Sequence, residues 1–241
     1  MTATLIISAT PGEITDLAKA FRATPEVRGL PWEILTSTHN DHRLIFASTG
    51  IGAANCAAAA SLLLHIFSPR FLIMTGCAGA YPGSGLRIGD LAVATREIFA
   101  DIGVLRADGI HGMKHMGLPL LERNGVPSFN DFPLSTALLN LALKSAAARG
   151  TALRAGSFLT VSACSGTLVR GEELRTRFGA ICENMEGAAA ALVSARFGVD
   201  LLEVRGISNH VEDRDVPGWD IPLAVKASTG FLESFIRELT T

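Results

Sequence analysis

Short apolar runs alternate along the chain with longer stretches in which apolar residues recur at helical spacing. Strands covered by helices on both faces are nearly continuous apolar runs, so this alternation is typical of an α/β layer structure. It predicts strands near Leu5–Ala9, Trp32–Thr36, Arg43–Thr49, Phe71–Thr75, Asp90–Thr95, Arg154–Val161 and Leu201–Ile207. It predicts helices at Glu13–Ala23, Ala53–Phe67, Leu134–Ala148, Gly171–Phe178, Met185–Phe197 and Ile221–Leu239. No repeat or shift in composition divides the chain, and we expect one α/β domain over residues 1–241.

The segment 107–133 follows neither pattern and is rich in Gly, Pro, His and Asn. It is the longest irregular stretch that the sequence predicts. Long segments without secondary structure are often lids or binding loops. We therefore expect this segment to be mobile or to cover a substrate.

The composition favours a small-molecule site. The 241 residues are 48% hydrophobic and 18% charged, and 21 basic and 23 acidic residues give a net charge of −2. Nucleic acids and anionic membranes attract an excess of positive charge, which this chain lacks. Its longest apolar runs, Ala57–Phe67 and Phe71–Ala80, are shorter than the roughly 18–20 residues of a spanning helix. We expect a soluble protein that binds neither nucleic acid nor membrane.

The cysteines and the N-terminus indicate a cytoplasmic protein. Four cysteines at positions 56, 77, 164 and 182 are too few and too widely spaced for a disulfide framework, and none has zinc-site spacing. The first residues lack the basic, then long apolar, pattern of a secretory signal. We expect a reduced cytoplasmic location and no metal.

Glycine-rich loops follow several predicted strands, at residues 8–13, 49–52, 75–80 and 205–209. Ligands bind at the carboxyl ends of strands in open α/β sheets, because glycines let backbone N–H groups approach them. Each loop alone is weak evidence. Gly50 and Gly52 also fit a tight turn from strand to helix, and they lack the third glycine of a dinucleotide fingerprint. The loops together predict one ligand crevice.

The segment 183–190 places a carboxylate, Glu186, in the first turn of an apolar helix. Such a carboxylate could face the crevice with its helix buried behind it. It could equally do no more than favour the positive end of its own helix. The pattern alone leaves both interpretations open.

Three motifs together resemble the purine nucleoside phosphorylase and nucleosidase superfamily. They are residues 75–80 (TGCAGA), 184–188 (NMEGA) and 205–209 (RGISN). Within it, residues 79–86, 183–187 and 208–209, followed by Arg214-Asp215 and Gly218-Trp219, resemble the futalosine hydrolase family. The resemblance implies a central twisted mixed β-sheet flanked by helices. It also implies hydrolysis of futalosine to hypoxanthine and dehypoxanthine futalosine on a route to menaquinone, without a cofactor.

The resemblance also assigns candidate site residues. It implies that Met185 and Glu186 line the ribose, where an acceptor-only carboxylate suits two hydroxyl donors. It implies that Asn209 contacts the purine edge. The remaining candidates for binding the nucleoside substrate are Cys77, Ala78, Gly79, Arg205 and Ser208. We expect Cys77 to be a buried thiol and not a nucleophile, because glycosidic cleavage through an oxocarbenium-like state needs water and a carboxylate.

The sequence departs from the family pattern in the first glycine-rich loop. Related adenine-releasing nucleosidases carry a water-activating glutamate there, and an ungapped alignment puts Gly12 at that position with Glu13 beside it. A one-residue difference in the loop would bring Glu13 into place as the base. The alternative is that Glu13 is an exposed residue in the first turn of a helix.

Two other functions remain open. A purine nucleoside phosphorylase, or another purine nucleosidase, would share the fold, although a carboxylate in the first loop would repel a phosphate dianion. A non-catalytic nucleoside-binding module would need no Glu13. The benzoate of futalosine requires a cation or a dipole at the far end of its pocket, for which Arg214, His111 and Lys114 are candidates. Relatives usually assemble, so we expect a homo-oligomer and specifically a homodimer.

Overall fold

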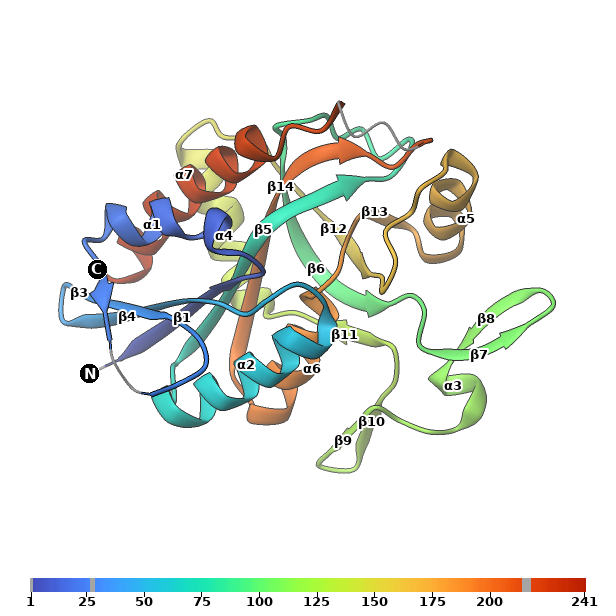
Figure 1. Ribbon diagram of the computed structural model, residues 1–241, viewed down its shortest axis with the longest axis horizontal. Helices are drawn as coiled ribbons and strands as arrows, with labels where there is room; N and C mark the ends of the chain where they lie inside the picture. Colours follow the sequence, from blue (N-terminus) through green and yellow to red (C-terminus); the bar gives the residue numbers. More distant parts are fainter. Residues whose placement is uncertain (1, 27–28, 214–217) are drawn as a thin grey trace.

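The computed structural model describes residues 2–26, 29–213 and 218–241, which adopt a mixed α/β architecture (Figure 1). The main sheet consists of β1 (Ala3–Ser8), β2 (Thr24–Pro25), β3 (Ile34–His39), β4 (His42–Ser48), β5 (Phe71–Ala80), β6 (Leu91–Phe99), β11 (Asp131–Pro133), β12 (Leu153–Thr160), β13 (Ala180–Asn184) and β14 (Asp200–His210). Its order is β11-β6-β12-β13-β5-β1-β4-β3-β2, and β14 pairs with both β5 and β6. The sheet therefore contains parallel and antiparallel pairs, as the mixed sheet of the prediction requires.

Five of these strands form a closed ring, in which each strand pairs with two others. β5 pairs with β13, β13 with β12, β12 with β6, β6 with β14, and β14 again with β5. A closed ring of pairings leaves no free edge and brings the ends of distant strands to one place. β13, β5 and β14 thereby present their later residues side by side.

Helices cover both faces of the sheet (Figure 1). They are α1 (Thr15–Ala20), α2 (Ala53–Phe67), α4 (Thr136–Ala148), α5 (Leu168–Phe178), α6 (Gly187–Phe197) and α7 (Ile221–Leu239). Alternate residues of β1 point to opposite faces: Leu5 and Ile7 pack in the core that includes α2 and α6, whereas Ile6 packs in the core that includes α1, α4 and α7. Burial on both faces explains why β1 is a continuous apolar run. Within the described ranges, no helix combines the length and the apolar character needed to cross a membrane.

The predicted elements are largely confirmed. Each predicted strand overlaps a strand of the main sheet, and helices α2 and α7 have the predicted bounds. β13 was not predicted, because only Ala180, Ile181 and Cys182 are apolar in it before the polar Glu183 and Asn184. The predicted helix Glu13–Ala23 is instead a 3₁₀ turn, η1 (Pro11–Glu13), followed by the shorter α1.

The prediction of an irregular segment at 107–133 is wrong. This region contains β8 (Gly109–Gly112), which pairs with β7 (Gly103–Arg106), the short helix α3 (Met113–Met116), the hairpin of β9 (Leu121–Arg123) with β10 (Val126–Ser128), and β11. Glycine at positive φ allows these tight hairpins: Gly125 lies in the turn between β9 and β10, and Gly109 directly follows the turn between β7 and β8. The β7–β8 and β9–β10 hairpins project from the body of the molecule (Figure 1).

Candidate active site

A pocket of 270 Å³ lies where η1 meets the later residues of β5, β13 and β14. All nine residues predicted to form the site line it: Glu13, Cys77, Ala78, Gly79, Met185, Glu186, Arg205, Ser208 and Asn209. Its other lining residues are Ala9, Thr10, Ile51, Val161, Cys164, Ser165, Glu183, Asn184, Trp219 and Ile221. The structure thus brings together side chains from distant parts of the chain.

Glu13 is buried at the pocket, with 5% of its surface exposed. Its Oε1 accepts a hydrogen bond from the Cys77 backbone N–H at 3.0 Å. Its Oε2 accepts from the Thr10 N–H at 2.9 Å and from the Thr10 hydroxyl at 3.0 Å. Gly12 has no side chain to offer, so Glu13 is the residue of this loop whose carboxylate reaches the pocket. The alternative interpretation of Glu13 as an exposed helix residue is wrong.

Gly76 leaves the space that the Glu13 carboxylate occupies. A Cβ at this position would lie 2.6 Å from Glu13 Oε1 and 3.0 Å from Arg205 Nη1. The φ of Gly76 is also positive, at 149°, where side chains are rarely found. Glycine is therefore required for β5 to pass so close to these two charges.

Glu186 precedes α6 as its N-cap residue, but its side chain does not cap that helix. Its Oε1 accepts from the Gly52 backbone N–H at 2.9 Å, and its Oε2 lies 3.5 Å from Arg205 Nη1. Asn184 caps the start of α6 instead, since its Oδ1 accepts hydrogen bonds from the N–H groups of Glu186 and Gly187. The carboxylate of Glu186 is thereby released from its own helix and lines the pocket.

Arg205 is buried between carboxylates, with 1% of its surface exposed. Its Nε donates to Glu203 at 2.8 Å, and its Nη1 donates to the Cys77 carbonyl at 3.2 Å. Burial lowers the pKa of the guanidinium, but the charges of Glu203, Glu186 and Glu13 together raise it above its usual value. Arg205 is therefore a permanent cation, and its positive charge is balanced by the neighbouring carboxylates.

A second buried carboxyl lies behind this arginine. Glu97 is fully buried and accepts hydrogen bonds from Thr160 Oγ1 at 2.8 Å and from Asn184 Nδ2 at 2.5 Å. Burial, followed by the charge of Glu203, raises its pKa well above the usual range. Glu97 and Glu203 are hydrogen-bond partners, so the raised pKa of Glu97 favours the form in which its protonated carboxyl donates to Glu203. Nothing in the local sequence distinguished these two glutamates from surface residues.

Asn209 has its amide orientation fixed by two neighbours. The Ser208 hydroxyl donates to its Oδ1 at 2.8 Å, and its Nδ2 donates to the His210 carbonyl at 3.1 Å. An amide nitrogen carries two N–H groups, so one remains for a ligand in the pocket. The residue is 9% exposed, which keeps that donor away from bulk water.

Glu183 is a lining residue whose role sequence reasoning missed. Its Oε1 accepts from the Ser165 backbone N–H at 2.8 Å. Its Oε2 accepts from the hydroxyls of Tyr81 at 2.9 Å and Ser165 at 2.7 Å. The residue stood in the segment 183–187 that suggested the family, but its donors come from residues far away along the chain.

The sulfur-containing residues form part of the wall. Burial, followed by the charge of Glu13, raises the pKa of Cys77 to about 12. Cys77 is therefore a neutral thiol at physiological pH, a poor nucleophile. Met185 Sδ lies 3.4 Å from Cys164 Sγ at the pocket wall.

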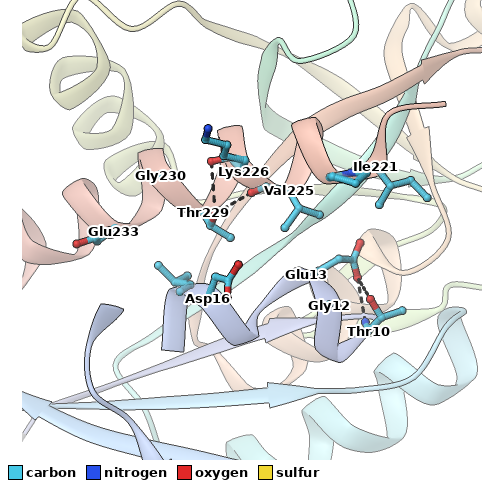
Figure 2. A pocket seen from close by; sticks show the side chains of 12 residues that line it. Thr10, Gly12, Glu13, Asp16, Ile221, Val225, Lys226, Thr229, Gly230 and Glu233 are labelled. Atoms are coloured by element: carbon cyan, nitrogen blue, oxygen red, sulfur yellow. Dashed lines mark hydrogen bonds between the residues drawn. The ribbon is translucent and has the colours of Figure 1, made fainter. Parts of the chain in front are cut away.

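A larger groove of 700 Å³ adjoins the pocket on the side of α7 (Figure 2). The two cavities share Thr10, Glu13 and Ile221. In the groove, Glu13 is the buried charged residue, whereas Asp16 and Lys226 are more accessible to solvent. Convergent buried charges therefore mark the smaller pocket as the candidate site.

Of the candidates for a benzoate cation, the two that the structure describes, His111 and Lys114, lie away from the pocket. Arg214 lies outside the described residues, as does Asp215 of the same motif. His111 bonds to Asp108 in the β7–β8 hairpin, and neither His111 nor Lys114 lines the pocket. Within the described ranges, no group of three or more His, Cys, Asp and Glu side chains could hold a metal ion.

Comparisons with known proteins agree with this fold. A family model described as the Phosphorylase superfamily matches residues 3–237. Futalosine hydrolase from Thermus thermophilus is 33% identical over 209 residues, 87% of this chain and 86% of that protein. The 5'-methylthioadenosine/S-adenosylhomocysteine nucleosidase from Halalkalibacterium halodurans is 29% identical over 178 residues, 73% of this chain and 72% of that protein. The native structure of futalosine hydrolase of Helicobacter pylori strain 26695 is similar in fold, with a TM-score of 0.85, 23% identity and coverage of 98% of both chains.

Proposed function

Because the chain belongs to the phosphorylase superfamily, we propose that it is a nucleosidase that hydrolyses the N-glycosidic bond of futalosine. The products would be hypoxanthine and dehypoxanthine futalosine. Its relatives include futalosine hydrolases and nucleosidases of 6-aminopurine compounds, so the family alone supports only nucleosidase chemistry. The choice of substrate rests on the groups that face the base.

The orientation of Asn209 is the observation that carries this choice. The Ser208 hydroxyl donates to the amide oxygen, and the amide nitrogen keeps an N–H for the ligand. A 6-oxopurine offers acceptors at O6 and N7, which match this donor. An unmatched buried polar group costs about 1–3 kcal/mol, so the amide favours a 6-oxo base over one with a 6-amino group.

Glu13 fits the role of the base that activates water. Two backbone N–H groups and the Thr10 hydroxyl hold its carboxylate in place, and the Cys77 thiol also lies within hydrogen-bond reach. A carboxylate positioned in this way can take a proton from a water molecule in the pocket. As the water oxygen bonds to C1' of the ribose, the C1'–N9 bond breaks and its electron pair leaves with the base. Glu13 takes one proton of the water, and the N–H of Asn209 stabilises the departing purine anion. The purine then takes up a proton from solvent, and Glu13 returns its proton to solvent, which restores the carboxylate.

Glu186 fits the role of the ribose-binding group. Its carboxylate accepts one N–H from Gly52 and keeps acceptor capacity for the 2'- and 3'-hydroxyls. The same negative charge would stabilise the positive charge that develops on the ribosyl ring as the bond breaks. Arg205, which lies between Glu186, Glu203 and the Cys77 carbonyl, would hold these groups in place.

The charges of the pocket favour hydrolysis over phosphorolysis. Among the lining residues that the structure describes, Arg205 is the one cation, and carboxylates already surround it. A phosphate dianion would meet Glu13 and Glu186 without a cation of its own. Water, which is neutral, meets no such barrier.

Product analysis tests the proposal. The purified protein is incubated with futalosine, inosine or methylthioadenosine, each with and without phosphate, and the products are separated by liquid chromatography. We expect hypoxanthine and free sugar product from futalosine in phosphate-free buffer. A sugar 1-phosphate that accumulates with added phosphate would identify a phosphorylase. Faster release of adenine from methylthioadenosine would overturn the choice of substrate, and tight binding without turnover of any of the three would indicate a binding module.

A further inference from the structure

Three adjacent strands place Glu183, Gly79 and Asn209 in one row. Gly79 on β5 is the register partner of Glu183 on β13 and of Asn209 on β14. Neighbouring strands are about 4.8 Å apart, and residues in register point to the same face of the sheet. A carboxylate and an amide therefore flank a residue that has no side chain.

Gly79 lets these two side chains approach each other. A Cβ on this residue would lie 3.1 Å from Asn209 Nδ2, 3.1 Å from Val211 Cγ2 and 3.6 Å from Glu183 Cγ, so neighbouring side chains already fill the space beside Gly79. Gly79, Asn209 and Glu183 all line the pocket. The wall of the pocket therefore carries a hydrogen-bond donor, the Asn209 amide, close to an acceptor, the Glu183 carboxylate.

The Glu183 side chain is held as an acceptor. Tyr81, and Ser165 through both its N–H and its hydroxyl, donate three hydrogen bonds to its two oxygens. A carboxylate has four lone-pair positions, so one on Oε1 remains for a ligand. Because the residue is 5% exposed, a hydrogen bond formed there would be shielded from water.

We propose that Glu183 is a second base-reading residue, which accepts the N1–H of a 6-oxopurine while Asn209 donates to O6 or N7. The inference rests on the proposed nucleosidase function and specifies the base. A 6-oxopurine presents a donor at N1 beside an acceptor at O6, which matches both side chains. A 6-aminopurine presents the reverse pattern, and its N1 lone pair would face the carboxylate. Together the two residues reject a 6-amino base more strongly than either would alone.

Base binding tests this role without requiring turnover. Titration calorimetry measures the Kd of hypoxanthine and of adenine for the wild-type protein and for Glu183→Gln. We expect the wild type to prefer hypoxanthine by about 10- to 100-fold, the range for a mismatched buried polar group. Glu183→Gln should lower that ratio by about tenfold, because the new amide can donate to N1 of adenine. A ratio that stays at the wild-type value would overturn the inference.

Tyr81→Phe is the matched control. It removes one of the donors that hold Glu183 but leaves the carboxylate in place. A merely structural role of the cluster would make Tyr81→Phe and Glu183→Gln alike, whereas base reading leaves the hypoxanthine-to-adenine ratio of Tyr81→Phe close to that of the wild type. An equal loss of the ratio in both variants would contradict the proposal.

A change in the ligand gives a test that needs no variant. In 1-methylhypoxanthine a methyl group replaces the N1–H, so the wild-type protein should bind it at least about 10-fold more weakly than hypoxanthine. Equal affinity would overturn the inference even if Glu183→Gln failed to fold. Hypoxanthine selectivity that depends on Glu183, together with no hydrolysis of futalosine, would refute the proposed function and leave the base-reading role intact.

Discussion

The Cys77 amide and the Glu13 carboxylate lie 64 residues apart in the sequence and are joined by a hydrogen bond of 3.0 Å. Thr10 donates to the other oxygen of the same carboxylate from its own loop. The backbone of β5 and the 3₁₀ turn therefore fix the carboxylate between them. In the proposed role of Glu13 as a base, a carboxylate held in this way would lose little freedom on binding the attacking water.

Glu13→Gln should lower kcat while leaving substrate binding largely intact. The amide has nearly the same shape but cannot take a proton from water at neutral pH, and general bases contribute about 10²- to 10⁴-fold. Steady-state kinetics in phosphate-free buffer measure the loss. If turnover is unchanged, the base is another group.

Gly76→Ala should slow turnover by displacing the same carboxylate. The added methyl group would meet Glu13 Oε1 at 2.6 Å, and a misplacement of about 1 Å can cost on the order of 10²-fold in rate. Gly12→Ala is the control, because the nearest atom to its added Cβ is Thr10 Oγ1 at 3.9 Å. Similar kcat values for the two variants would show that the geometry of Glu13 is not critical.

Glu186→Gln should reduce kcat far more than it raises KM. The negative charge matters most when the ribosyl ring becomes cationic, so its loss removes transition-state stabilisation of about 10²- to 10³-fold. The measurement is kcat and KM with futalosine. A variant with normal kcat and raised KM would restrict Glu186 to binding the ground state.

Asn209→Asp should shift selectivity toward the 6-amino analogue of futalosine. One oxygen of the new carboxyl would face the His210 carbonyl, which now accepts an N–H at 3.1 Å, so the acid would have to be protonated or rotate. The protonated form could donate to N7, but the carboxylate would repel O6. The ratio of kcat/KM for the two substrates should fall by about 5- to 150-fold. An unchanged ratio would mean that Asn209 does not read the base.

Glu97→Gln should become more stable relative to the wild type as the pH rises. Burial and the charge of Glu203 raise the pKa of Glu97 above 4.5, its usual value, so the folded wild type holds a proton that the unfolded chain releases. The free energy of unfolding of the wild type therefore falls with pH above the unfolded pKa, until the folded pKa is reached. The glutamine amide of the variant keeps an N–H donor for Glu203 and does not titrate.

Urea denaturation at several pH values between about 5 and 8 measures this difference. Glu97→Leu is the companion variant. It cannot donate to Glu203 and should be less stable than Glu97→Gln throughout, by about 1–3 kcal/mol for the unpaired buried oxygen. A constant difference between wild type and Glu97→Gln over this pH range would mean that Glu97 is not the protonated partner.

Local patterns in the sequence were sufficient for much of the architecture. The strands buried on both faces, such as β1 and β5, are largely apolar, and the apolar spacing of α2 and α7 placed both helices. The resemblance of the motifs was sufficient for the lining residues, since Gly79, Glu186 and Asn209 all reach the pocket. Both the apolar spacing and the motifs are properties of residues that are close together in the sequence.

The parts of the fold and the site that could not be predicted depend on residues that are far apart in the sequence. Tyr81 bonds to Glu183 across 102 residues, and Asn184 bonds to Glu97 across 87. No local pattern distinguishes such a glutamate from one on the surface, because its environment exists only after the strands have paired. The ring of strands could not be predicted for the same reason, as it depends on β13, which is too short and too polar to be recognised.

The long separations between bonded residues also bear on how the protein folds. Gly52 bonds to Glu186 across 134 residues, and Cys77 bonds to Arg205 across 128. Contacts between distant segments form slowly compared with helices, because closing a long loop of chain costs conformational entropy. During refolding, helical circular dichroism should therefore recover before the pocket can bind a ligand. Recovery of ligand binding would indicate that the last strand, β14, has paired with β5 and β6.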